Sequence, residues 1–199
     1  MSATAHMHFM ALETNSRERL LQLARQAITH QLNYGEQLKI DVSSLPSELK
    51  LIRATFVTLT IDKELRGCIG MIDAVRELAV DVAYNAHAAA FRDPRFTALT
   101  ESELPSINIE IAILSPMESI NCEDEAELIA KLNPGIDGLL IADGMRRATF
   151  LPKVWEQIPD RSQFIRHLKA KAGFASHYWS SSVQFYRYRT ETFQEKTEN

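Results

Sequence analysis

GLLIADGMRRATFL, residues 138–151, carries two strand-like runs on either side of the turn dipeptide Asp143-Gly144. Asp-Gly between such runs is a strong β-hairpin signal, because a two-residue turn needs residues that tolerate positive φ. A hairpin joins antiparallel strands. Outward from it, helical and strand patterns mix without a regular strand-helix-strand rhythm. We therefore predict the α+β class, with a mostly antiparallel sheet packed with helices instead of a doubly wound parallel sheet.

Two helices are predicted in the N-terminal half from apolar residues that recur at helical spacing. The first runs from Arg17 to Asn33, and Gly35 supplies its stop. The second runs from Val75 to Phe91, with Asp73 as its cap and several alanines in its buried stripe. It ends at Asp93-Pro94, because proline cannot continue the hydrogen-bond ladder of a helix.

Two strands in the same half show clear alternation. Residues 54–61 place Val57 and Leu59 on one face and Thr58 on the other. Residues 107–114 carry four isoleucines at every second position, so Glu110 must point away from the apolar face. Both patterns are typical of strands that bury one side.

Composition limits the class of protein. The chain has 199 residues, 45% of them hydrophobic, with a formal net charge of -4 and two cysteines that form no C-x-x-C pair. The acidic total argues against a protein that mainly neutralises nucleic-acid phosphates. No stretch approaches the about 20 apolar residues that cross a bilayer, and no signal peptide is evident, so we expect a cytoplasmic protein without membrane association.

The hexapeptide Leu65-Arg66-Gly67-Cys68-Ile69-Gly70 is the most site-like segment. Its two glycines need either positive φ or room for another backbone or a ligand to approach. In a strand, Arg66 and Cys68 share one face, and a guanidinium beside a thiol favours the reactive thiolate. The competing interpretations are a packed, inert cysteine and an arginine in a structural ion pair.

These residues, with others that follow in order, resemble the AMMECR domain family, the A component of the AmmeMemoRadiSam system. The resemblance covers roughly Arg17 to Phe193 and includes, besides the hexapeptide, Asp93-Pro94-Arg95-Phe96, residues 109–116, residues 135–141, residues 147–155 and residues 171–173. It implies an α+β fold of two unequal lobes with a cleft between them. It also implies a MEMO-type protein and a radical SAM enzyme as partners.

The expected domain organisation is simple. One AMMECR domain, built from one lobe or two closely packed lobes, spans residues 16–193. Flexible segments are expected at residues 1–15 and 194–199.

Other residues join Cys68 as candidates. Glu110 is a candidate acid or base, and His87, one turn before the end of its helix, could assist a nearby thiol. The candidate catalytic set is therefore Cys68, Glu110 and His87, and the candidate binding set is Arg66, Gly67, Gly70, Asp93 and Arg95. Each has a structural alternative: an ion pair for Glu110, a dipole-stabilised charge for His87, and an ordinary helix-ending turn for Asp93 and Arg95.

Three functions stay open, and whether the chain is an enzyme is one of the questions. The first is an enzyme or enzyme accessory in a modification pathway, using the cleft beside Arg66 and Cys68. The second is a protein-binding adaptor in which Cys68 is only packed. The third is nucleic-acid binding through a late group of basic residues, Arg161, Arg166, His167, Lys169 and Lys171. The sequence does not identify a cofactor or an oligomeric state, and it predicts no metal-binding residues.

Overall fold

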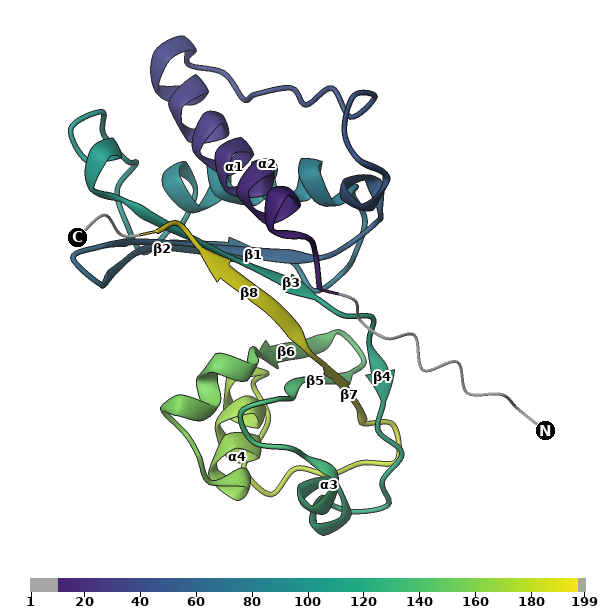
Figure 1. Ribbon diagram of the computed structural model, residues 1–199. Helices are drawn as coiled ribbons and strands as arrows, with labels where there is room; N and C mark the ends of the chain where they lie inside the picture. Colours follow the sequence, from purple (N-terminus) through teal and green to yellow (C-terminus); the bar gives the residue numbers. More distant parts are fainter. Residues whose placement is uncertain (1–10, 197–199) are drawn as a thin grey trace. The chain divides into compact units, whose positions relative to one another are not determined.

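The structure, a computed structural model, describes residues 11–196 and divides into two compact units (Figure 1). The first unit holds the described residues up to Ile113 and those from Glu191 onward, and the second holds Leu114–Thr190. Each unit contains helices and one antiparallel sheet, so the predicted α+β class is confirmed. No helix in the described range is long and apolar enough to cross a membrane.

The first unit packs two helices on one face of a four-stranded sheet. Its elements are α1 (Thr14–Tyr34), η1 (Ser47–Lys50), β1 (Thr55–Ile61), β2 (Glu64–Gly70), α2 (Leu78–Phe91), η2 (Leu104–Ser106), β3 (Asn108–Leu114) and β8 (Thr190–Gln194). The strand order is β2-β1-β3-β8, so β2 is an edge strand. Figure 1 shows α1 and α2 on the same face of this sheet. The opposite face carries Thr58 and Glu110 together with Phe56 and Ala112.

The core of the first unit lies between the sheet and the helices. Val57, Leu59 and Ile111 are fully buried there, together with the α1 and α2 residues that repeat at helical spacing. Both alternation patterns predicted from the sequence are therefore confirmed. Removing this much aliphatic surface from water is the main driving force for folding the unit.

The second unit has its own sheet and its own core. Its elements are β4 (Glu118–Ser119), α3 (Glu125–Lys131), β5 (Gly138–Asp143), β6 (Arg146–Phe150), η3 (Pro152–Glu156), α4 (Arg161–Lys171) and β7 (Gln184–Tyr188). The strand order is β4-β7-β5-β6. The predicted hairpin is present, but its turn residues are Gly144 and Met145 instead of Asp143 and Gly144, because Asp143 still pairs with Arg146. Gly144 takes the positive φ of 58° that such a two-residue turn requires.

The start of α2 corrects the sequence prediction. The helix begins at Leu78 instead of Val75, its N-cap is Glu77 instead of Asp73, and Val75 is 59% exposed. Glu77 is extended because it forms a β-bridge with Ile52, in the segment after η1. On either side of it, the Arg53 N–H donates to the Arg76 carbonyl at 3.2 Å and the Leu78 N–H donates to the Leu51 carbonyl at 2.8 Å. Hydrogen bonds to residues 51–53 therefore keep this segment out of the helix, although its apolar residues recur at helical spacing.

The two chain ends expected to be flexible are only partly described, since residues 1–10 and 197–199 lie outside the described residues. Within the described range, the N–H of Leu12 donates to the Glu191 carboxylate at 2.9 Å. Glu195 accepts hydrogen bonds from the Arg25 guanidinium at 2.6 and 2.7 Å. The described residues near both ends thus form hydrogen bonds within the first unit.

The turn between β1 and β2 stores local strain that a substitution can release. Asp62 and Lys63 both hold positive φ, 51° and 69°, and neither is a glycine. We predict that Lys63→Gly raises the free energy of unfolding by about 0.5–1 kcal/mol, because glycine adopts this region without a steric penalty. Urea denaturation measures the change. Lys63→Ala keeps the strained conformation and is the control; a glycine variant no more stable than that control contradicts the prediction.

Candidate functional site

The hexapeptide forms β2, and Gly67 fixes which way its side chains point. A Cβ on Gly67 would lie 2.1 Å from the backbone carbonyl oxygen of Ala89, so β2 and α2 approach each other at this point. Gly67 therefore faces the helix, and Cys68, the next residue along the strand, faces the opposite side of the sheet. Cys68 is half-buried and forms no disulfide.

Gly70 is also a packing glycine. A Cβ there would lie 2.3 Å from the Phe56 ring. Neither Gly67 nor Gly70 has positive φ. The sequence left open whether these glycines provide positive φ or room for close packing. The structure shows close packing at both positions.

Asp93 and Arg95 close the edge of the sheet at Cys68. The Asp93 carboxylate accepts the backbone N–H of Cys68 at 2.9 Å and the guanidinium of Arg95 in a bidentate pair, at 2.9 and 2.7 Å. Arg95 also donates to the Cys68 carbonyl at 3.3 Å. The hydrogen bonds from Arg95 hold the pKa of the Asp93 carboxyl well below its usual range, although Asp93 is buried. The Asp93 charge is thus fully compensated.

Arg66 pairs with a carboxylate that the sequence analysis did not single out. Its guanidinium donates to Glu103 at 2.7 and 3.1 Å, and this contact lowers the pKa of Glu103 to about 2. One nitrogen of Arg66, Nη1, is buried without a partner among the described residues. The Phe96 ring lies near both guanidinium groups, with its centroid 5.9 Å from Arg66 and 5.5 Å from Arg95. Among the described residues, Arg95 is the arginine whose guanidinium donates a hydrogen bond to the Cys68 carbonyl. The guanidinium of Arg66 forms an ion pair with Glu103 instead.

A polar row crosses three strands on the sheet face opposite the helices. Thr58 of β1 is paired with Cys68 of β2 on one side and with Glu110 of β3 on the other. The Thr58 hydroxyl donates to the Cys68 sulfur at 3.3 Å. The structure therefore brings Cys68 and Glu110 onto the same row, separated by Thr58, which the sequence analysis placed on the correct face but did not select.

His87 belongs to a different environment. It is 4% exposed, and its Nε2 lies 2.9 Å from the Gln31 side-chain oxygen on α1. Burial lowers the pKa of His87, and the charge of Arg92 lowers it further. This is the direction opposite to the one that a helix dipole produces. His87 contacts Gln31 of α1 and the Phe91 ring of α2, whereas Cys68 contacts Thr58, Asp93 and Arg95.

The late basic group does not form one positive surface. Lys169 is buried and pairs with Glu125 of α3, and its ammonium lies 5.7 Å from the centroid of the Trp179 ring. Lys171 donates to the Thr149 carbonyl at 2.9 Å. Two of the five basic residues thus form contacts within the second unit. This weakens the nucleic-acid interpretation, because phosphate binding needs cationic side chains that reach the surface.

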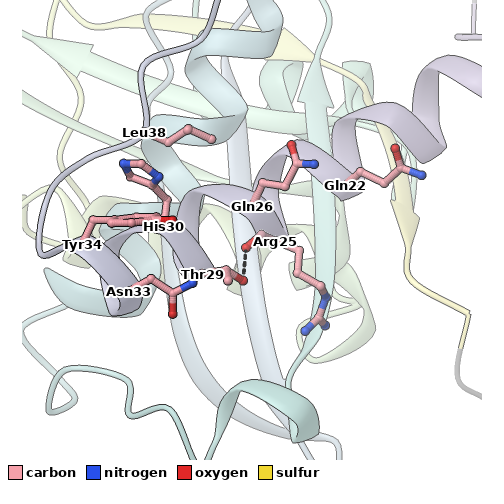
Figure 2. Close-up of a pocket in the computed structure, with 8 residues that line it drawn as sticks. All are labelled: Gln22, Arg25, Gln26, Thr29, His30, Asn33, Tyr34 and Leu38. Carbon is pink, nitrogen blue, oxygen red and sulfur yellow. Dashed lines mark hydrogen bonds between the residues drawn. The ribbon is translucent and has the colours of Figure 1, made fainter.

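A hollow of about 420 Å³ runs along the outer side of α1, away from Cys68. Figure 2 shows Gln22, Gln26 and His30 along one row of the helix, with Leu38 beside His30. Its charged residue, Arg25, is already bound to Glu195 and to the Leu104 and Ile107 carbonyls. The surface of the hollow is mostly apolar, and its arginine is already engaged.

The chain is similar in sequence and in structure to known proteins of archaea and bacteria. The AMMECR1 family model matches residues 21–193. A protein of Methanocaldococcus jannaschii, MJ0810, is 36% identical over 167 residues, covering 82% of this chain and 83% of that protein. A Thermotoga maritima protein is 35% identical over 173 residues, covering 85% and 94%. The crystal structure of the uncharacterized protein PH0010 from Pyrococcus horikoshii is similar with a TM-score of 0.85 at 29% identity, covering 93% and 94%.

The close contact at Gly67 predicts a specific sensitivity. We expect Gly67→Ala to lower the free energy of unfolding by about 2–3 kcal/mol, because the new methyl group must push the Ala89 backbone away. Leu65→Ala, at a 42% exposed position of the same strand, is the control and should cost far less. Urea denaturation compares the two variants, and equal losses would show that Gly67 is not tightly packed.

Burial of His87 predicts a pH-dependent stability. Its pKa in the folded chain is below the unfolded value of 6.5, so protons bind the unfolded chain more tightly. The free energy of unfolding should therefore fall as pH is lowered below about 6.5, until the folded-state pKa is passed. His87→Gln should flatten this fall between pH 7 and pH 5, whereas the same change at exposed His167 should leave it intact. Identical slopes in wild type and His87→Gln would refute the assignment.

Proposed function

The chain belongs to the AMMECR1 family, and on this premise we propose that it acts through the Cys68 thiol in a modification pathway. As the family resemblance implies, its partners in that pathway are a MEMO-type protein and a radical SAM enzyme. The working surface is the outer face of the first sheet around β2. Cys68 is the reactive group, Glu110 is the nearby carboxylate, and Arg66, Gly67, Gly70, Asp93 and Arg95 hold the strand in place.

One observation carries this proposal: Cys68 is half-buried, and its sulfur is hydrogen-bonded to a hydroxyl. Free cysteines that serve only as packing residues are usually fully buried in apolar surroundings. The backbone of Cys68 is meanwhile held on both its N–H and its carbonyl. A half-buried thiol on a strand held in this way suits nucleophilic chemistry, which depends on fixed geometry.

The chemistry around the thiol also limits the substrate. Asp93 is paired with Arg95 and Glu103 with Arg66, so the ion pairs beside Cys68 are internally neutral. A strongly charged substrate would have to compete with these pairs. We therefore expect an uncharged reacting group at Cys68.

The reactivity of Cys68 tests the proposal directly. We predict that Cys68 reacts with iodoacetamide at pH 7 at least about threefold faster than N-acetylcysteine, because its strand holds the sulfur in a fixed position beside the Thr58 hydroxyl. Peptide mass spectrometry separates Cys68 from Cys122, whose pKa is raised by burial and by Glu127. Cys122 is therefore the internal control and should react more slowly. A Cys68 rate at or below that of the free thiol would defeat the catalytic proposal.

An adaptor is the second candidate, favoured by the exposure of Leu65 at 42% beside the Arg66 ion pair. In that case the β2 segment docks the MEMO-type partner and Cys68 is only packed. Leu65→Ser and Arg66→Ala would then weaken co-purification with the MEMO-type protein, while Cys68→Ser would not. Undiminished binding by both variants would remove this segment from the interface.

A further inference from the structure

The pairing of Thr58 with Cys68 is the closer of the two kinds of antiparallel pair. In an antiparallel ladder, residues alternate between pairs that exchange backbone hydrogen bonds and pairs that do not, and side chains approach more closely in the second kind. The N–H and carbonyl of Cys68 both point outward, to Asp93 and Arg95. The Thr58–Cys68 pair is therefore of the second kind, which accounts for the 3.3 Å between the hydroxyl and the sulfur.

Both partners of this contact are held in place. Cys68 is fixed by the backbone bonds to Asp93 and Arg95, and the contact of Gly67 with Ala89 sets the face on which Cys68 points. Thr58 is in the centre of the strand, paired on both sides, and its branched Cβ restricts χ1. The hydroxyl is therefore aimed at the sulfur by the sheet itself.

We propose that Thr58 is a positioning residue that donates its hydroxyl hydrogen to the Cys68 sulfur and so favours the anionic nucleophile. This inference rests on the proposed function, in which Cys68 is the reactive thiol. When the S–H bond breaks, its proton passes to water and the electron pair stays on sulfur. The Thr58 O–H remains intact, and its hydrogen bond becomes stronger because the acceptor now carries a charge.

Charged groups on every neighbouring element must be held constant in a test. Arg66 lies on β2 itself, Asp93 and Arg95 follow α2, and Glu110 lies on β3 beyond Thr58. All four remain in each variant described below. Differences between variants therefore report on the hydroxyl at position 58.

The test measures the iodoacetamide alkylation rate of Cys68 from pH 6 to pH 10, resolved by peptide mass spectrometry. We predict that Thr58→Val slows Cys68 about three- to tenfold at pH 7, with the two profiles converging at high pH. Thr58→Ser, which restores a hydroxyl, should stay within about twofold of wild type. Thr60→Val is the matched control, since Thr60 lies two residues along β1 and is paired with Leu65 instead of Cys68.

Thr58→Ala serves as a second hydroxyl-free variant if Thr58→Val does not fold. A hydroxyl-free variant whose profile superimposes on that of wild type overturns the inference, and so does a uniform slowing at every pH, which indicates changed access. The ratio between variants decides this even when wild-type Cys68 is no faster than N-acetylcysteine. That outcome defeats the proposed function alone, whereas a fast Cys68 with an unchanged Thr58→Val profile defeats the inference alone.

Discussion

The hydrogen bond from the Cys68 backbone N–H to the Asp93 carboxylate, 2.9 Å long, is formed at the open edge of the first sheet. An edge strand normally exposes unpaired N–H and carbonyl groups that can pair with other chains. Here Asp93 takes the N–H, Arg95 takes the carbonyl, and the two side chains neutralise each other. The turn after α2 therefore blocks the edge at Cys68, and the hexapeptide keeps only its face for contact with other molecules.

The orientation of that face depends on small residues in both elements. Ala89 of α2 can approach β2 only because position 67 has no Cβ. Gly67 of β2 and Ala89 of α2 thus form one packing contact. Asp93 reaches the edge because α2 ends two residues before it. The same arrangement directs Cys68, Thr58 and Glu110 away from the helices. Site and fold are therefore determined by the same contacts.

Much of this was predictable where a short local pattern decides the outcome. The Asp143-Gly144 hairpin, the alternation of the β1 and β3 residues and the stop of α1 at Gly35 follow from turn chemistry and periodicity, and the structure contains all three. The family resemblance could also be recognised from the sequence, because its motifs span nearly the whole chain.

The contacts of the site residues were harder to predict. A regular hairpin around Asp62-Lys63 pairs Thr58 with Gly67, but an irregularity in the register shifts the partner to Cys68. No sequence pattern announces that one-residue shift. Glu103 was missed for a similar reason, since its contact with Arg66 bridges 37 positions of the chain.

Amide hydrogen exchange at Cys68 tests the central claim most directly. An outward-facing N–H on an edge strand exchanges quickly unless a side chain holds it. The account predicts that the Cys68 amide is protected in the wild-type protein and loses this protection in Asp93→Ala, while the inward-facing amide of Ile69 stays protected in both. A Cys68 amide that exchanges rapidly in the wild type, or that keeps its protection without the Asp93 carboxylate, would contradict it.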